Sequence, residues 1–180
     1  MTDPKAIQRT APQTRTVHAV VDSPVGPLTL VADDDALAGV FMTDQRHLPA
    51  DDRFGERVAA SDEPVLAAAA SELAEYFAGE REEFDVPLAP RGTDFQQRVW
   101  ARLREIPAGA TTTYGTIAAD LGLPPGASRA VGAAVGRNPI GIVVPCHRVV
   151  GASGALTGYA GGLERKVWLL EHEGVLASAP

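Results

Sequence analysis

Apolar and polar residues alternate along the first part of the chain with the period of β-strands. Thr16 to Val21 alternates, and Leu28 to Val31 and Leu37 to Met42 are further short apolar runs. Clusters of Asp, Ser, Pro and Gly, which favour turns, separate the three runs. The pattern predicts a small antiparallel three-stranded sheet.

A helical period follows a polar stretch over residues 43–62, which is expected to be a loop. Ser61 can cap a helix that has Pro64 in its first turn and ends near Gly79. Its apolar face would hold Leu66, Ala69, Leu73, Tyr76 and Phe77. Residues 80–92 are charged and proline-containing, and we interpret them as a linker between two halves.

Helical signals dominate the second half. Thr93 and Gln96 form a capping box ahead of a helix that we expect to run to Pro107. Short helices over 113–121 and 128–135, joined by a Gly/Pro turn, indicate a helix-turn-helix. A last helix is expected from Leu163 to Glu173 with Leu163, Val167 and Leu170 facing inward.

These elements predict an α+β fold in two parts. Residues 1–15 are expected to be a disordered leader, and residues 175–180 to be frayed. Residues 16–88 would form an N-terminal α/β domain with a small antiparallel three-stranded sheet plus helix. Residues 92–175 would form a mostly helical C-terminal domain that carries the helix-turn-helix and an active-site loop.

The second helix of the pair carries almost only small side chains. Apart from Arg129, nothing between Ser128 and Val135 is long, whereas a helix that reads the major groove needs long polar side chains. A smooth surface suits close approach to a nucleic-acid backbone or minor groove. Small residues also allow tight helix packing, and the sequence favours neither interpretation.

Charge is distributed unevenly along a chain whose net charge is −7. Residues 1–90 carry 7 basic and 17 acidic side chains, whereas residues 91–150 carry 7 basic and 3 acidic ones. The arginine excess in the second segment is compatible with a polyanionic partner or with ordinary surface variation. No apolar run approaches the roughly 20 residues of a membrane span, and we expect a cytoplasmic protein without a membrane partner.

Cys146 is the only cysteine, and it follows an apolar run over residues 140–144 that is expected to be a strand stopped by Pro145. A thiol on such a turn is either a nucleophile or a small buried apolar group. His147 could take its proton, and Glu173 is one candidate to orient that imidazole. Hydrolysis and transfer of a group to sulfur are both compatible with these residues.

The stretch from Ile142 to Val149 closely resembles the active-site motif of the O6-alkylguanine-DNA alkyltransferases, the methylated-DNA–protein-cysteine methyltransferases. The C-terminal 85 or so residues resemble this family densely, and the N-terminal half only loosely. The matching blocks, in the family's order, are Thr93 to Trp100, Tyr114 to Ala118, Arg129 to Gly132, Asn138-Pro139, Gly158 to Gly162 and Leu169 to Gly174.

The resemblance implies a role for each residue of a catalytic group. Cys146 would accept the alkyl group from O6 of guanine once and irreversibly. His147 would take the thiol proton through a water, and Glu173 would orient His147. Tyr114 would donate a hydrogen bond to guanine N3, and Asn138 would brace the turn before the cysteine.

The resemblance also implies contacts to double-stranded DNA carrying O6-alkylguanine. Arg129 would fill the place of the nucleotide flipped out through the minor groove. Ala127, Ser128, Ala130 and Gly132 would form the surface of the helix that meets the DNA.

The pocket for the flipped base is implied in the same way. The backbone carbonyls of Cys146 and Val149 would accept from the guanine amine. Tyr159 and Ala160 would wall the pocket beside Pro145, with the Ala160 N–H facing O6. The alkyl group could also come from O4 of thymine, and the sequence does not decide whether this second substrate is used.

Departures from the family pattern limit what is expected. Ala160 stands where some members have Ser, which could alter the tolerance for large adducts. The N-terminal half has no cysteine for the zinc site of some members, so we expect no metal. We also expect no cofactor and a monomer in solution. A DNA binder that senses alkylated bases without transfer, and a cysteine hydrolase, remain as alternatives.

Overall fold

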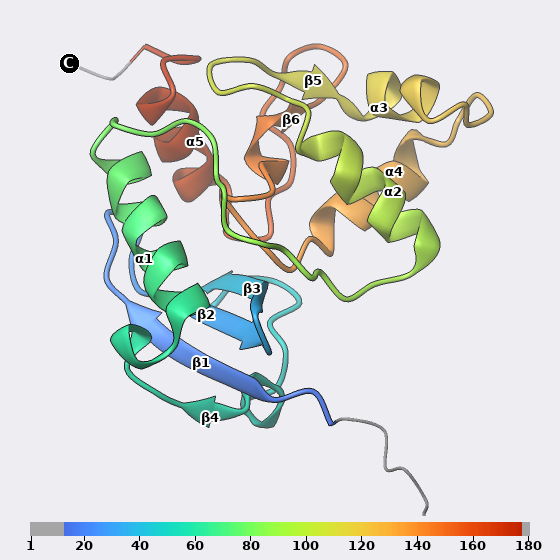
Figure 1. Cartoon of the computed structure of the whole chain (residues 1–180). Helices are drawn as coiled ribbons and strands as arrows, with labels where there is room; N and C mark the ends of the chain where they lie inside the picture. Colours follow the sequence, from blue (N-terminus) through green and yellow to red (C-terminus); the bar gives the residue numbers. More distant parts are fainter. Residues whose placement is uncertain (1–12, 178–180) are drawn as a thin grey trace, which may run out of the picture.

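The computed structural model describes residues 13–177 and places a sheet half beside a helical half (Figure 1). The sheet half contains β1 (Thr16–Val21), β2 (Leu28–Asp33), β3 (Ala36–Met42), β4 (Glu56–Arg57), the short 3-10 helices η1 (Asp51–Phe54) and η2 (Ala60–Asp62), and α1 (Pro64–Phe77). All but three residues of the expected leader, and residues 178–180 at the other end, lie outside the described residues.

The sheet has four strands in the order β3-β2-β1-β4, and it is mixed. β1, β2 and β3 pair antiparallel as expected, with Thr16 opposite Asp33 and Leu28 opposite Met42. The expected three-stranded antiparallel sheet is wrong in one respect, because β4 adds to β1 in parallel. Both residues of β4 are exposed, so no apolar alternation marked this strand within the polar segment.

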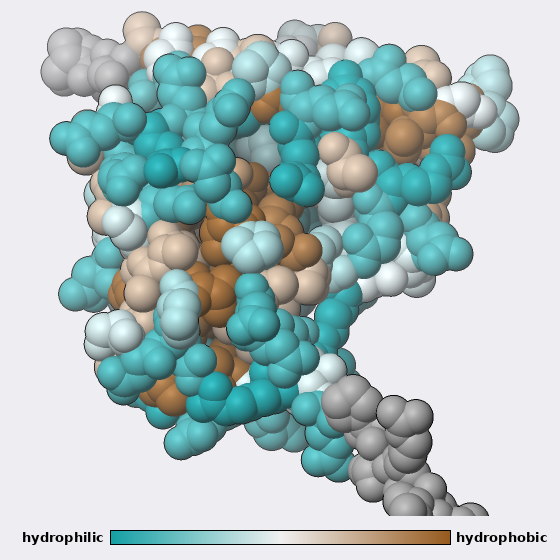
Figure 2. Space-filling model, viewed as in Figure 1, coloured by the Kyte–Doolittle hydropathy of each residue, from teal (hydrophilic) through white to brown (hydrophobic). Residues whose placement is uncertain are grey.

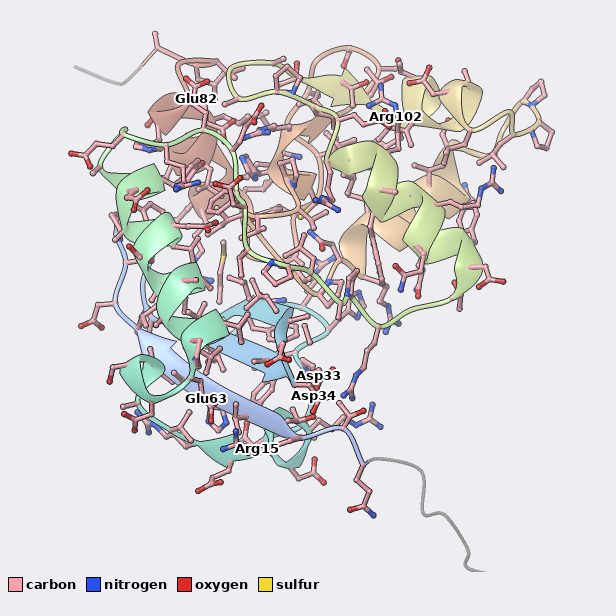
Figure 3. The ribbon with its side chains drawn as sticks, in the orientation of Figure 1. Arg15, Asp33, Asp34, Glu63, Glu82 and Arg102 are labelled. Carbon is pink, nitrogen blue, oxygen red and sulfur yellow. The ribbon has the colours of Figure 1, made fainter. Side chains whose placement is uncertain are left out.

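Helix α1 lies over the sheet and begins at Pro64, whose missing N–H costs nothing at that position (Figure 1). The N-cap is Glu63, and the expected cap Ser61 lies earlier, in η2. Leu66, Ala69 and Leu73 are buried, as the helical period predicted. The ion pair between Arg15 and Glu63 joins the start of β1 to the start of α1 (Figure 3).

The segment over residues 80–92, predicted as a linker, is held against the sheet half. The Glu72 carboxylate accepts hydrogen bonds from the backbone N–H groups of Asp85 (2.9 Å) and Val86 (3.2 Å), and Val86 is buried. Leu88 forms a bridge with Leu37 of β3. On the face shown in Figure 2, hydrophilic residues cover much of the surface, and hydrophobic ones gather around the middle of the molecule.

The helical half contains the expected pair of short helices after a capped first helix. Thr93 and Gln96 make both hydrogen bonds of the capping box, which is confirmed. The first helix ends at Leu103, short of Pro107, although Ile106 is still buried. The elements are α2 (Asp94–Leu103), β5 (Thr112–Thr113), α3 (Tyr114–Asp120), α4 (Ser128–Gly136), η3 (Cys146–Arg148), β6 (Val149–Val150) and α5 (Leu163–His172).

The inward face of α5 differs from the one expected. Leu163 is 50% exposed, while Lys166 is fully buried beside Leu169 and Leu170. A lysine can occupy that position because backbone carbonyls accept all of its donors, as described below. No helix within residues 13–177 has the length and apolar character needed to cross a membrane.

The apolar run over residues 140–144 forms tight turns, so the expected buried strand before Cys146 is wrong. Ile140 makes a single bridge to Val40 of β3, and Ile142 has a φ of 70°. The Asn138 side chain donates to the Val144 carbonyl (2.8 Å) and accepts from the Ile140 N–H (3.0 Å). These local bonds take the place of a strand ladder.

Candidate active site

A pocket of about 200 Å³ brings together residues from both halves of the chain. Cys146 lies in it with Tyr114, Tyr159 and Ala160, all expected site residues. The rest of its lining comes from α4 and its end (Gly132, Ala133, Val135 and Gly136), from Gly158, and from Arg46 and His47 of the N-terminal half.

Cys146 is the first residue of η3, and only 6% of it is exposed. Burial raises the pKa of its thiol above the ordinary value, and Asn138 and Lys166 counteract this only in part. The sulfur is therefore protonated at neutral pH. A thiol is a poor nucleophile, so a reaction at this sulfur requires a base close by.

His147 and Glu173 form a buried pair next to the cysteine. The His147 Nε2 lies 2.7 Å from the Glu173 Oε1, and their side chains are 0% and 2% exposed. Burial lowers the pKa of His147, although the carboxylate favours the charged form, so the ring is neutral. With the Nε2 proton directed at Glu173, the buried Nδ1, which has no hydrogen-bond partner within residues 13–177, is left as an acceptor.

The Glu173 carboxylate accepts from two further residues that the sequence analysis missed. Arg148 donates from Nε to Oε2 (2.9 Å) and from Nη2 to Oε1 (2.9 Å), and the Tyr76 hydroxyl donates to Oε1 (2.7 Å). Burial raises the pKa of Glu173, but the hydrogen bonds from His147 and Arg148 outweigh it and hold that pKa well below its usual range. The carboxylate is therefore ionised.

Different signals were available for these two residues. Arg148 directly follows the Cys-His pair in the sequence, and a buried arginine needs a carboxylate partner. Tyr76 matched the apolar face of α1 and was predicted only as a core residue. Burial raises the pKa of Tyr76, and the charge of Glu173 raises it further, so the hydroxyl stays protonated and remains a donor.

Lys166 is a third residue that the sequence analysis missed. Its ammonium donates to the carbonyls of Val149, Thr157 (3.0 Å) and Gly158 (3.3 Å). It thereby ties the segment after the cysteine to the glycine-rich loop that lines the pocket. A lysine on the inward face of an amphipathic helix is the signal that could have revealed it.

Tyr114 stands at the start of α3, where Thr113 caps the helix by accepting from the Thr116 N–H. Its hydroxyl makes one long hydrogen bond of 3.4 Å, to the Thr157 carbonyl. Burial raises the pKa of Tyr114, so the hydroxyl is a donor at neutral pH. A Cβ at Gly132 would come within 3.7 Å of the ring, so α4 passes close to it.

The buried and exposed faces of α4 show how far helix packing explains its small residues. Val131, Ala134 and Val135 are buried, and the Trp100 indole donates to the Ala134 carbonyl (2.8 Å), so packing explains the inner face. Ser128, Arg129 and Ala130 are exposed, and Ala127 and Gly132 are half-buried. Packing does not explain small residues on an exposed face.

Two expected pocket residues lie just outside the pocket lining. Val149 pairs with Thr112 between β6 and β5, and its N–H donates to the Cys146 carbonyl. Pro145 lines a separate hollow together with Arg148. Within residues 13–177, no group of three or more His, Cys, Asp or Glu residues is placed to hold a metal ion.

Comparison with known proteins gives family matches to both halves. The family described as "6-O-methylguanine DNA methyltransferase, DNA binding domain" matches residues 94–175. The family described as "6-O-methylguanine DNA methyltransferase, ribonuclease-like domain" matches residues 16–90.

Relatives and solved structures agree with these matches. The methylated-DNA–protein-cysteine methyltransferase of Mycobacterium tuberculosis (strain H37Rv) is 51% identical over 156 residues, which cover 87% of this chain and 91% of the relative. That of Methanosarcina acetivorans is 50% identical over 158 residues, covering 87% and 97%. The crystal structure of Mycobacterium tuberculosis OGT in complex with DNA has a TM-score of 0.78 at 50% identity, covering 87% of this chain and 91% of that one. A buried Cys-His-Glu group beside a helix-turn-helix, and relatives this similar over nearly their whole length, lead to one conclusion: the chain belongs to the methylated-DNA–protein-cysteine methyltransferase family.

Proposed function

We propose that this protein repairs DNA directly, by moving an alkyl group from O6 of guanine in duplex DNA to Cys146, once per molecule. The observation that carries the proposal is a protonated cysteine in the floor of a pocket, directly followed in the chain by a neutral histidine that is held by an ionised glutamate. The close relatives are named as methylated-DNA–protein-cysteine methyltransferases, and one of them has been solved with DNA.

The transfer begins with a proton. The thiol proton of Cys146 passes through a water to Nδ1 of His147, and the ionised Glu173 stabilises the imidazolium that forms. The thiolate then attacks the alkyl carbon, so that an S–C bond forms and the C–O6 bond breaks. The electron pair of that bond goes to the guanine, which takes up a proton from water and remains in the DNA as an ordinary base, while His147 returns its proton to water.

Tyr114 supports the leaving base. Its hydroxyl has only one long hydrogen bond, so it can turn to donate to N3 of the guanine while negative charge builds up on the ring. The product is a thioether with no group in the pocket to reverse the reaction. One molecule therefore removes one alkyl group.

A base inside a duplex cannot reach a buried sulfur, so the proposal includes flipping of the damaged nucleotide. The exposed face of α4 meets the minor groove with Ala127, Ser128, Ala130 and Gly132, whose small side chains permit close approach. Arg129 occupies the space that the nucleotide leaves, which offsets part of the lost stacking. Contacts of this kind do not depend on the neighbouring sequence.

The proposal also covers the domain organisation, the oligomeric state and the cellular location. We propose that residues 16–88 and 92–175 act as two domains of one monomer, in the cytoplasm and without a cofactor. Size-exclusion chromatography with light scattering, with and without a DNA duplex, tests whether the protein is a monomer.

Intact-mass measurement after reaction with a duplex that carries O6-methylguanine tests the transfer. We expect one added methyl group per protein, located at Cys146 by peptide mapping, and none on the Cys146→Ser variant, which should still bind the duplex. An unchanged mass would sink the transferase proposal, and repeated turnover of the duplex would identify a hydrolase instead.

A further inference from the structure

A second depression adjoins the reactive pocket, and its lining is strongly basic. It holds about 260 Å³ and contains four arginines and a histidine, namely Arg46, Arg53, Arg91, Arg137 and His47. No Asp or Glu is among its lining residues, although acidic side chains outnumber Lys and Arg by 23 to 16 in the whole chain. The remaining lining is Phe41, Gln45, Pro49, Gln96, Trp100, Gly136, Asn138 and Pro139.

These arginines come from distant parts of the chain. Arg46 and Arg53 belong to the polar segment after β3, Arg91 to the connection between the halves, and Arg137 to the end of α4. The fold therefore gathers like charges on one surface, which is unfavourable unless something compensates for them. The acidic N-terminal half thereby adds Arg46, Arg53 and His47 to a depression that it shares with the helical half.

Within the described residues, only one of the four arginines is paired with an acidic side chain of the protein itself. Arg91 pairs with Asp33 (2.6 Å), which Figure 3 labels at the end of β2. Within residues 13–177 the guanidinium groups of Arg46, Arg53 and Arg137 make no ion pair or hydrogen bond, and all three residues are exposed. Three guanidinium groups are thus free to bind an anion.

The position of this depression indicates which anion it meets. Arg46, His47 and Gly136 line both depressions, so the basic one is continuous with the pocket of Cys146. A nucleotide that enters the pocket carries a phosphate on each side. Guanidinium groups match phosphate oxygens with paired N–H donors, and a concave surface of one sign concentrates such a ligand.

We propose that this basic depression is a second DNA contact, at which Arg53 and Arg137, beside Arg46, hold backbone phosphates next to the flipped nucleotide. The proposal rests on the proposed function for the identity of the DNA, and it adds a contact made by the N-terminal half. The contact differs from that of α4, since it neutralises charge and inserts nothing into the duplex. It assigns the polar segment over residues 43–54 a part in DNA binding.

Fluorescence anisotropy with a labelled, undamaged duplex, measured over a range of salt concentrations, tests the proposal. Each lost phosphate contact should make the plot of log affinity against log salt less steep by about 1. We expect this change for Arg53→Ala and for Arg137→Ala, and a change of about 2 for the double variant. The conservative Arg53→Lys should keep most of the slope.

Arg57→Ala is the matched control, because Arg57 is an exposed arginine of the same half that lies outside the depression. It should leave the slope unchanged. Equal slopes for the double variant and the unchanged protein would overturn the proposal, and so would an equal loss in Arg57→Ala, which would indicate a general effect of net charge. Thermal melting checks the fold of each variant.

Methyl transfer by the unchanged protein is measured on a duplex of the same sequence with O6-methylguanine. Transfer with an unaltered slope in the variants would refute only the phosphate contact. Absence of transfer with altered slopes would refute only the proposed function.

Discussion

The two halves of this protein divide the work at the active site differently from what their sequences indicate. The helical half supplies Cys146, His147 and Glu173, and it resembles the family densely. The sheet half supplies none of the groups that we propose to react, yet Tyr76 of α1 donates to Glu173, and the Arg46 N–H donates to the carbonyl of Ala160 (2.8 Å). The proposed chemistry is therefore located in one half, while the geometry of these residues depends on both.

Arg165 extends this dependence in the opposite direction. From α5 it donates to the carbonyls of Val25 (3.0 Å) and Thr43 (2.9 Å) in the sheet half, and to that of Gly161 (3.1 Å) beside the pocket. The glycine-rich wall of the pocket is thus held from both sides. Variants that separate chemistry from positioning test this division.

Glu173→Gln should have the largest effect, because it removes the charge that stabilises His147 in its protonated form. We expect the transfer rate to fall by roughly 10²- to 10⁴-fold, the usual contribution of an acid–base group. The buried Arg148 also loses its ionic partner, which costs about 3–5 kcal/mol of stability. Single-turnover kinetics and urea unfolding measure the two losses, and Glu171→Gln on the same helix is the control. A rate within a few-fold of the unchanged protein would contradict the assignment.

Arg129→Ala separates DNA handling from chemistry within the helical half. Transfer from duplex O6-methylguanine should slow by roughly tenfold or more, since extrusion of a base costs a few kcal/mol. Reaction with the free base O6-benzylguanine needs no extrusion and should change far less. Both are followed by the rate of modification of Cys146. Equal losses with the two substrates would refute the proposed insertion.

Tyr76→Phe tests whether the sheet half acts on the chemistry. The carboxylate loses one neutral donor, so its charge acts more strongly on His147 and raises the pKa of that ring. We expect the acidic limb of the rate against pH to move to higher pH, with a stability loss of about 1–2 kcal/mol. Alkylation of Cys146 by iodoacetamide across pH reports the shift without DNA. Phe77→Leu is a packing control, and an unshifted limb in Tyr76→Phe would leave Tyr76 a purely structural residue.

The pH dependence of stability should show the smallest effect. The pKa of His147 is lowered on folding from 6.5, so the unfolded chain binds more protons just below that pH. Its contribution is therefore complete above pH 6.5 and is lost as the pH falls below it. Glu173, also with a lowered pKa, adds a second loss below pH 4.5. Urea unfolding midpoints measured between pH 8 and pH 4 check this sign. A midpoint that stays constant in the unchanged protein but varies with pH in His147→Asn would contradict it.

Local patterns predicted much of this fold, and long-range contacts account for what they missed. The strand alternation, the capping box at Thr93 and the helix pair are all set by neighbours in the chain, and the structure confirms them. β4 is two exposed residues whose only reason to be extended is the edge of β1. The apolar run before Cys146 carries a strand composition, but the Asn138 side chain folds it into turns.

The site residues likewise divide into those that local sequence indicated and those that depend on long-range packing. Cys146 and His147 are adjacent in sequence, Glu173 was already one candidate carboxylate, and the family resemblance gave Glu173 its expected role. The donors that complete the site are separated from their acceptors: Tyr76 lies 97 residues before Glu173. A tyrosine on an apolar helical face gives no sign of where its hydroxyl ends, because that depends on how the two halves pack.

Under the proposed function each molecule reacts once, and the burial of the Cys146 sulfur then has a consequence for its lifetime. Peroxides and small electrophiles attack thiolates, and a molecule oxidised at its sole cysteine would have no second chance. A sulfur that stays protonated until a base, a relay and a substrate are all in place is protected from such losses. Under the proposed function, the raised pKa of this thiol would keep unreacted molecules available for the one lesion that each removes.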